Sequence, residues 1–197
     1  MNTWMIIGIA FGVLFAFLIY EIARRKRRVA TAAQSPATKP QLAVVDVYRG
    51  LRQMALTGSR VEIGLPEPTS PTTPWRVVMD WGLESGALTT VVAVSDGSAS
   101  IYYGSGGGAI GGIGHESVRL AAIKTVKIAG ELKPQMRLTK DFPLPQSGAV
   151  IFYAVTDAGV FTASATNEEM RSHRSEFYKL WDAAQGVITE FRAIQGK

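Results

Sequence analysis

The longest apolar run of the chain covers residues 4–20, WMIIGIAFGVLFAFLIY. At about 1.5 Å of rise per helical residue it extends about 25 Å, close to the ~30 Å hydrocarbon core of a bilayer. MNT precedes the run and EIARRKRR follows it, which reverses the charge order of a cleaved signal peptide. We therefore predict a permanent transmembrane anchor over residues 1–23.

Five cations follow the apolar run and predict its orientation: Arg24, Arg25, Lys26, Arg27 and Arg28. Moving one charge across a membrane potential costs about 2.3 kcal/mol per 100 mV, so this cluster should stay on the cytoplasmic side. We expect a single-pass protein of a bacterial inner membrane, with its N-terminus outside and its C-terminal domain in the cytoplasm. We also expect the five side chains to contact anionic lipid headgroups.

Small residues recur within the apolar run. Gly8 and Gly12 form a G-x-x-x-G, and Ala16 continues the row one turn further on. Such a row lets another membrane helix approach closely, although glycine and alanine also fall at this spacing by chance. Packing of a transmembrane helix against Gly8 and Gly12 is therefore one of two equally supported readings.

Beyond the basic segment and linker, residues 24–41, the pattern becomes that of a folded domain over residues 42–197. Helical spacing over residues 42–56 places Leu42, Val45, Tyr48, Leu51 and either Met54 or Leu56 on one side. Four prolines in residues 65–74 predict an exposed loop.

From residue 75 onward, alternating apolar runs and tight turns predict a series of hairpins. We expect strands at 75–83, 87–95, 98–104, 148–156 and 159–165, a short edge strand near 136–138, a helix over 115–130, and a last helix running without a break from a cap at Thr166 or Asn167 to Phe191. By strand parity, Trp75 and Trp81 fall on the same side of the first strand. The predicted fold class is α+β, an antiparallel sheet of about five or more strands flanked by helices.

This order of elements resembles the profilin-like and roadblock/longin-like class, in which terminal helices pack on a central antiparallel sheet. The resemblance covers about residues 42–195 and rests on the order of the elements and the placement of the turns. It implies a small adaptor or regulatory platform and supplies no catalytic residues.

The segment GSGGGAIGGIGHES, residues 104–117, is the most unusual stretch of the domain, with seven glycines in its first eleven positions. It contains three apolar residues, Ala109, Ile110 and Ile113, whose side chains we expect to be shielded from solvent. The segment could fold back on its own domain, with glycine supplying positive φ, or dock on a partner. We predict partner contacts at Gly106, Gly107, Gly108, Ile110, Gly111 and Ile113.

The alternative is that backbone N–H groups before His115 hold an anion or a nucleotide at the start of the helix. Gly106, Gly108 and Gly111 do match G-x-G-x-x-G. However, the Lys-Ser/Thr of a P-loop is missing and the neighbouring strands read as antiparallel, so the motif match is weak.

Composition narrows the chemistry further. The five clustered cations leave 16 basic residues against 16 acidic ones, which argues against nucleic acid as a partner. The chain has no cysteine, so thiolate catalysis and cysteine-bound zinc are excluded. We expect no metal, no cofactor and no catalytic residues; His115 should cap the helix, His173 should lie on a solvated helical face, and Asp80 should be paired if it is buried.

The sequence thus predicts a membrane-anchored protein with a cytoplasmic, non-catalytic interaction domain, an accessory or assembly subunit of an integral membrane protein complex. The alternative is a small-ligand, nucleotide or anion-binding regulatory domain, or an enzyme, that uses the glycine-rich segment before His115.

Overall fold

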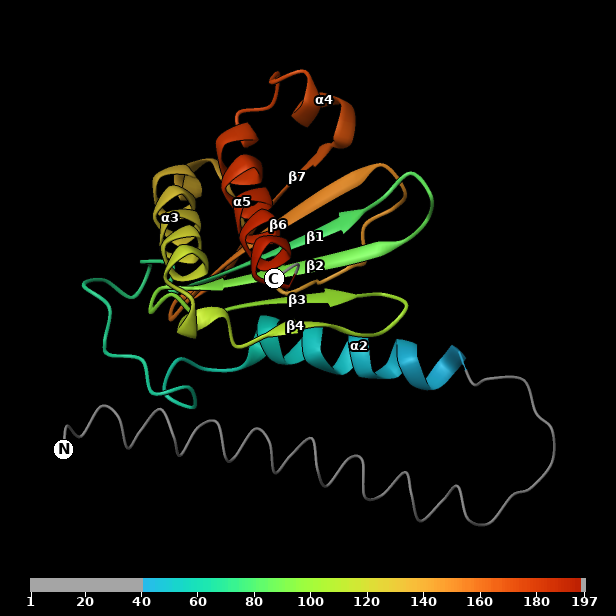
Figure 1. Ribbon diagram of the computed structural model, residues 1–197. Coiled ribbons are helices and arrows are strands. Elements are labelled where there is room, and N and C mark those ends of the chain that lie inside the picture. Colours follow the sequence, from blue (N-terminus) through green and yellow to red (C-terminus); the bar gives the residue numbers. More distant parts are fainter. Residues whose placement is uncertain (1–40, 196–197) are drawn as a thin grey trace, which may run out of the picture. The chain divides into compact units, whose positions relative to one another are not determined.

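A seven-stranded antiparallel sheet organises residues 41–195, the part of the chain that the computed structural model describes (Figure 1). The strand order is β4-β3-β2-β1-β6-β7-β5. The strands are β1 (Arg76–Gly82), β2 (Leu88–Val94), β3 (Ala99–Tyr103), β4 (Gly108–Ile110), β5 (Arg137–Thr139), β6 (Ala149–Thr156) and β7 (Gly159–Thr166).

The helices are α2 (Gln41–Thr57), α3 (Glu116–Leu132), α4 (Asn167–Arg171) and α5 (Tyr178–Gln195), with short 3-10 turns η1 (Gly112–Gly114) and η2 (Lys133–Gln135). The predicted α+β class and antiparallel sheet are confirmed. The predicted anchor, with Gly8 and Gly12, and the five cations lie outside the described residues. Within residues 41–195, no helix combines the length and apolar character needed to cross a bilayer.

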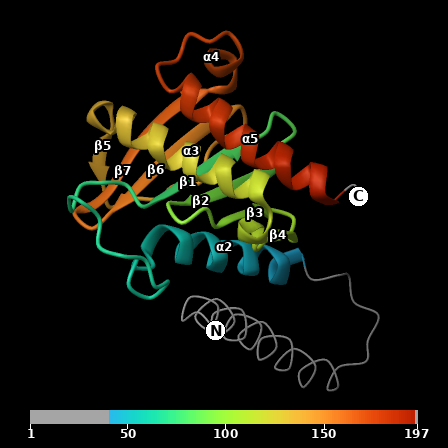
Figure 2. The same cartoon turned by 60° about the vertical axis from the view of Figure 1, so that its left-hand side comes forward.

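The helices cover both faces of the sheet. Helices α3 and α5 lie on one face and α2 lies on the other (Figures 1 and 2). Because successive strand side chains point to opposite faces, β1 contributes to two cores. Val77 and Met79 pack toward α3 and α5, whereas Val78 packs with Tyr48 of α2. The central strands of the sheet are therefore buried on both faces.

Helix α2 resolves the choice between Met54 and Leu56. Leu56 is 1% exposed and packs in the α2-side core, whereas Met54 is 46% exposed. The carbonyls of Met54 and Ala55 accept hydrogen bonds from the Arg76 guanidinium, at 3.2 and 2.7 Å. The Arg76 cation thereby satisfies the Ala55 carbonyl and adds a second donor to the Met54 carbonyl, which also accepts from the Gly58 N–H at 2.9 Å.

The prediction of one unbroken final helix is wrong, because the segment divides into α4 and α5. The start is as predicted: Thr166 caps α4 and forms a reciprocal capping box with Glu169. The Ser172 hydroxyl then donates to the Glu168 carbonyl at 2.7 Å, and such bonds compete with helix continuation. His173 follows with a φ of 56° and stacks on Tyr178 at 3.8 Å, so it does not lie on a helical face.

The two tryptophans of the first strand region do not share a face, contrary to the parity argument. Trp75 packs in the α2-side core, and Trp81 packs on the opposite side against Trp181. Strand β1 begins only at Arg76, so its alternation does not govern Trp75. The Trp81 indole N–H donates to the Asn167 side-chain oxygen at 2.8 Å, which joins β1 to the start of α4.

Candidate functional site

The glycine-rich segment contains a strand that the sequence pattern did not reveal. Strand β4 pairs with β3 through Ser100↔Ile110, Ile101↔Ala109 and Tyr102↔Gly108. Ala109 is 9% exposed and belongs to the core on the α3 and α5 side. The segment therefore does fold back on its own domain.

A tight turn connects the two strands of this hairpin. The Tyr103 N–H donates to the Gly107 carbonyl at 3.2 Å, and the Gly106 N–H donates to the Tyr103 carbonyl at 2.8 Å. Gly106 and Gly107 have φ of 96° and 82°, values that a residue with a Cβ rarely adopts. Gly111, at φ 86°, ends the strand in the same way. These glycines shape the hairpin, and among residues 41–195 no strand lies beside the outer edge of β4.

The backbone of β4 presents hydrogen-bonding groups along that free edge. In an antiparallel ladder, hydrogen-bonded and non-hydrogen-bonded pairs alternate. Because Tyr103 bonds to Gly107, the next bonded pair is Ile101 with Ala109. The N–H and C=O groups of Gly108 and Ile110 therefore point away from β3. Outside the ladder with β3, these groups make no hydrogen bond within residues 41–195.

This free edge also exposes apolar side chains and carries no charge. Ile110 is 47% exposed and Ile113, in η1, is 48% exposed. Residues 98–114 contain no charged residue. The structure thus brings the six predicted partner-binding residues, Gly106, Gly107, Gly108, Ile110, Gly111 and Ile113, onto one hairpin edge and the turn after it. We call this surface the β4 edge.

The opposite edge of the sheet offers a direct contrast. Strand β5 carries Arg137, and Lys133, Lys140 and Asp141 lie within four residues of it. Charged side chains on an edge strand are a common device against unwanted strand pairing. The β5 edge has this protection although Leu138 is 59% exposed, whereas β4 and the four residues on either side of it, residues 104–114, contain no charged residue.

The geometry at the start of α3 does not favour an anion. His115 occupies the N-cap position, but its side chain makes no capping hydrogen bond, so the expectation of a histidine side-chain cap is wrong. Glu116 lies in the first turn and accepts two hydrogen bonds from Arg119, each at 2.7 Å, which lowers the pKa of the Glu116 carboxyl. This carboxylate already occupies the positive end of the helix dipole and would repel a second anion.

Asp80 has the partner that the sequence could not name. Its carboxylate is fully buried and accepts from the Arg52 Nε at 2.8 Å and from the Thr90 hydroxyl at 2.6 Å. The Thr90 hydroxyl also bonds to the Tyr48 hydroxyl at 2.8 Å. Arg52 and Tyr48 come from α2, so this group of side chains ties the helix to β1 and β2.

The same network extends to the chain segment that precedes β6. Arg52 donates to the carbonyls of Phe142 and Pro143 at 3.0 and 2.9 Å, and the Tyr153 hydroxyl donates to the Pro143 carbonyl at 3.1 Å. Burial raises the pKa of Asp80, which the Arg52 guanidinium partly offsets, and raises the pKa of Tyr153 to about 12. We call Arg52, Asp80, Thr90, Tyr48 and Tyr153 the Arg52 network. Its polar groups form hydrogen bonds with one another and with backbone carbonyls, so we interpret the network as structural.

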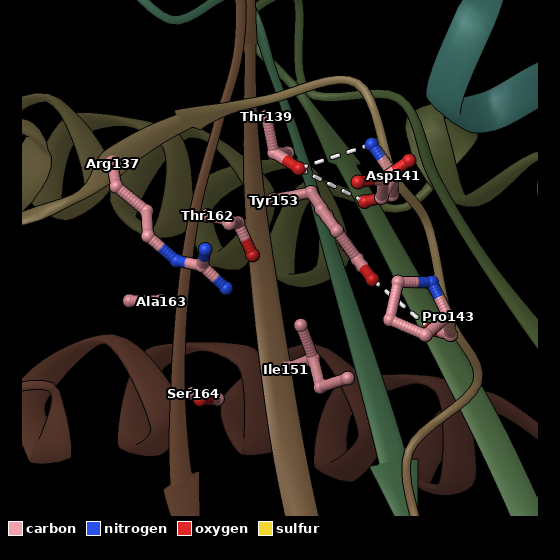
Figure 3. A pocket seen from close by; sticks show the side chains of 9 residues that line it. All are labelled: Arg137, Thr139, Asp141, Pro143, Ile151, Tyr153, Thr162, Ala163 and Ser164. Carbon is pink, nitrogen blue, oxygen red and sulfur yellow. Dashed lines mark hydrogen bonds between the residues drawn. The ribbon is translucent and has the colours of Figure 1, made fainter.

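A hollow of about 350 Å³, lined by both polar and apolar residues, lies over β5, β6 and β7 (Figure 3). Arg137 enters it from one side and Asp141 lies on the other. Its hydrogen bonds are internal: the Thr139 hydroxyl donates to the Asp141 carbonyl at 3.1 Å and accepts from the Asp141 N–H at 3.0 Å. The hydroxyls of Thr139, Tyr153 and Thr162 all bond to backbone groups of the chain, so few polar groups of the lining remain to orient a ligand.

Neither candidate metal ligands nor similarity to known proteins indicates a function for the described domain. Within residues 41–195, histidine, aspartate and glutamate side chains form no group of three or more that could hold a metal ion. Comparison with protein-family models, curated proteins and solved structures finds no match to this chain.

Proposed function

We propose that this chain is a single-pass membrane protein whose cytoplasmic domain, residues 42–197, is a non-catalytic interaction module that binds another polypeptide chain at the β4 edge. Its role is that of an accessory or assembly subunit of a membrane protein complex. The observation that carries the proposal is the β4 edge itself: outward backbone groups at Gly108 and Ile110, beside exposed Ile110 and Ile113, without a protecting charge.

The chemistry of strand addition fits this edge. An extended segment that lies beside β4 would satisfy the N–H and C=O groups of Gly108 and Ile110 and cover the exposed isoleucine side chains. Left open, such an edge is a hazard, because any extended chain can pair with it. A specific partner would prevent such unwanted pairing and would explain why the edge residues are uncharged.

The N-terminal sequence supports the membrane part of the proposal. The apolar run 4–20 is slightly shorter than the hydrocarbon core, a mismatch that local thinning of the bilayer accommodates, and the five cations Arg24 to Arg28 favour a cytoplasmic domain. Gly8 and Gly12 offer a second contact, with a helix of the same complex. The element order remains similar to that of the profilin-like and roadblock/longin-like class, which supports a platform function over an enzymatic one.

A proline at position 110 tests the role of the β4 edge. The Ile110 N–H points away from β3, so Ile110→Pro removes an outward donor while the ladder with β3 stays intact, and edge strands tolerate proline. The preceding Ala109 is extended, as proline requires. Ile110→Val is the matched control, because it keeps the donor and most of the side chain.

The readout is the mass and composition of the assembly that the full chain forms after extraction in a mild detergent. We expect the wild type and Ile110→Val to exceed the 21.3 kDa of one chain and Ile110→Pro to fall to that mass, after correction for detergent. Thermal unfolding of the three proteins should agree within a few degrees. Equal assemblies for Ile110→Pro and the wild type would contradict the proposal.

A further inference from the structure

We infer that the strand completing the β4 edge is β4 of a second copy of this chain, so that two sheets join into one across a two-fold axis at Ala109. This inference rests on the proposed function of the β4 edge and names its partner.

The register of β4 is self-complementary. In an antiparallel pair, only residues whose N–H and C=O groups face the partner can form bonded pairs. In β4 these residues are Gly108 and Ile110. A two-fold axis at Ala109 places Gly108 of one copy opposite Ile110 of the other, and the reverse, so outward groups meet outward groups at both positions. Four backbone hydrogen bonds result, with the two Ala109 residues as the non-bonded pair between them.

The side chains fit the same register. Directly paired residues share one face of a sheet, so the exposed Ile110 of one copy lies beside the bare backbone of Gly108 in the other. A bulky residue thus meets a residue without a side chain, at both ends of the pair. Residues 98–114 carry no charge, so the two paired hairpins bring no like charges of their own together.

The two-fold axis also suits two chains anchored in one membrane. An axis between adjacent antiparallel strands runs perpendicular to the sheet, so each copy keeps α2 on the same face of the joined sheet. Both copies of α2 therefore lie on the same side of the joined sheet. A linker over residues 29–41 spans at most about 45 Å, and identical linkers hold identical edges at the same distance range from the bilayer.

The size of the contact explains why the membrane matters. A three-residue strand pair with Ile110 and Ile113 falls short of the roughly 1,000 Å² that a stable interface in solution buries. When both chains are anchored in the same bilayer, their domains diffuse in one plane. The effective concentration of one β4 edge around the other is therefore higher than in solution. We therefore expect an assembly that survives extraction in a mild detergent at high protein concentration, that dissociates when the detergent solution is diluted, and that is firm in a bilayer.

A single cysteine provides the test, because the chain has no other. Non-bonded antiparallel pairs have Cα atoms about 4.5 Å apart, within the ~4.4–6.8 Å range of disulfides. Full-length Ala109→Cys, reconstituted in lipid vesicles and treated with a mild oxidant, should form a disulfide-linked dimer in most molecules. The controls are Leu138→Cys, exposed on the opposite edge, and Ser105→Cys, in the hairpin turn.

The controls should yield at most about a fifth as much dimer, and their yield should fall as lipid is added while that of Ala109→Cys persists. A monomeric Ala109→Cys that unfolds like the wild type would overturn the inference, as would equal dimer yields at positions 109 and 138. If Ala109→Cys is too unstable to test, an assembly of the wild type that contains this chain alone and reaches twice its mass supports the inference. An assembly that Ile110→Pro disrupts but that holds only one copy of this chain overturns it and leaves the proposed function standing.

Discussion

The Arg52 network makes a quantitative prediction about how α2 is held to the sheet. Replacing Arg52 with Met keeps an unbranched side chain of similar length and removes the guanidinium that binds Asp80 and the carbonyls of Phe142 and Pro143. The fully buried Asp80 carboxylate then keeps only Thr90 as a partner. Removing one member of a buried ion pair typically costs about 3–5 kcal/mol, and we expect a loss of this size.

The loss of stability in Arg52→Met should depend on the charge of Asp80 and therefore on pH. Asp80→Asn removes the uncompensated charge, so Arg52→Met with Asp80→Asn should recover about half or more of the loss. Burial already raises the pKa of Asp80, and losing Arg52 raises it further. Between the unfolded pKa of about 3.9 and the higher folded pKa, the folded state binds more protons. The stability of Arg52→Met should therefore fall as pH rises through that window.

Chemical denaturation of the full chain in detergent, followed by tryptophan fluorescence, measures these differences. Arg49→Met is the matched control, because Arg49 lies on the same helix and is exposed, and its loss should stay within about 0.5 kcal/mol. A loss below about 1 kcal/mol for Arg52→Met, or a double variant as unstable as the sum of the two single ones, would refute the reasoning.

Two further predictions concern buried positions. A Cβ at position 112 would lie 2.7 Å from Cζ of Phe191, so Gly112→Ala should lower the free energy of unfolding by about 1–3 kcal/mol, whereas Gly114→Ala, with open space around it, should change it little; equal effects in denaturation curves would contradict the packing argument. The pKa of Tyr153 is raised to about 12, so the folded phenol keeps its proton while the unfolded one, near 10, loses it. Stability should therefore fall between about pH 10 and 12, and less steeply in Tyr153→Phe; identical alkaline unfolding profiles would count against the raised pKa.

Much of the fold is predictable because its signals are local. The hairpins show alternation and turn residues, and the Thr166 cap is followed by Glu169 at the spacing of a capping box. Strand β4 escapes this reasoning, because three residues, one of them glycine, carry too short a pattern. Its existence depends on pairing with β3. The apolar Ala109 and Ile110 within the glycine-rich segment were the available signal.

Long-range features were out of reach for a different reason. Asp80 and Arg52 are 28 residues apart on a strand and a helix, and no spacing rule links them. The break between α4 and α5 depends on Ser172 and His173 in a segment whose apolar residues keep helical spacing. The six candidate contact residues were predicted from composition, but their role as a free strand edge came from the register of the hairpin.

Amide hydrogen exchange at positions 109 and 110 of the full-length protein in lipid bilayers tests most directly whether the β4 edge is occupied. The Ala109 N–H faces β3 and should exchange slowly in any folded state. The Ile110 N–H faces outward. We expect it to exchange slowly in the membrane as well, and to exchange rapidly when the protein is diluted to monomers in detergent. Rapid exchange at Ile110 in the bilayer, beside a protected Ala109, would contradict the account.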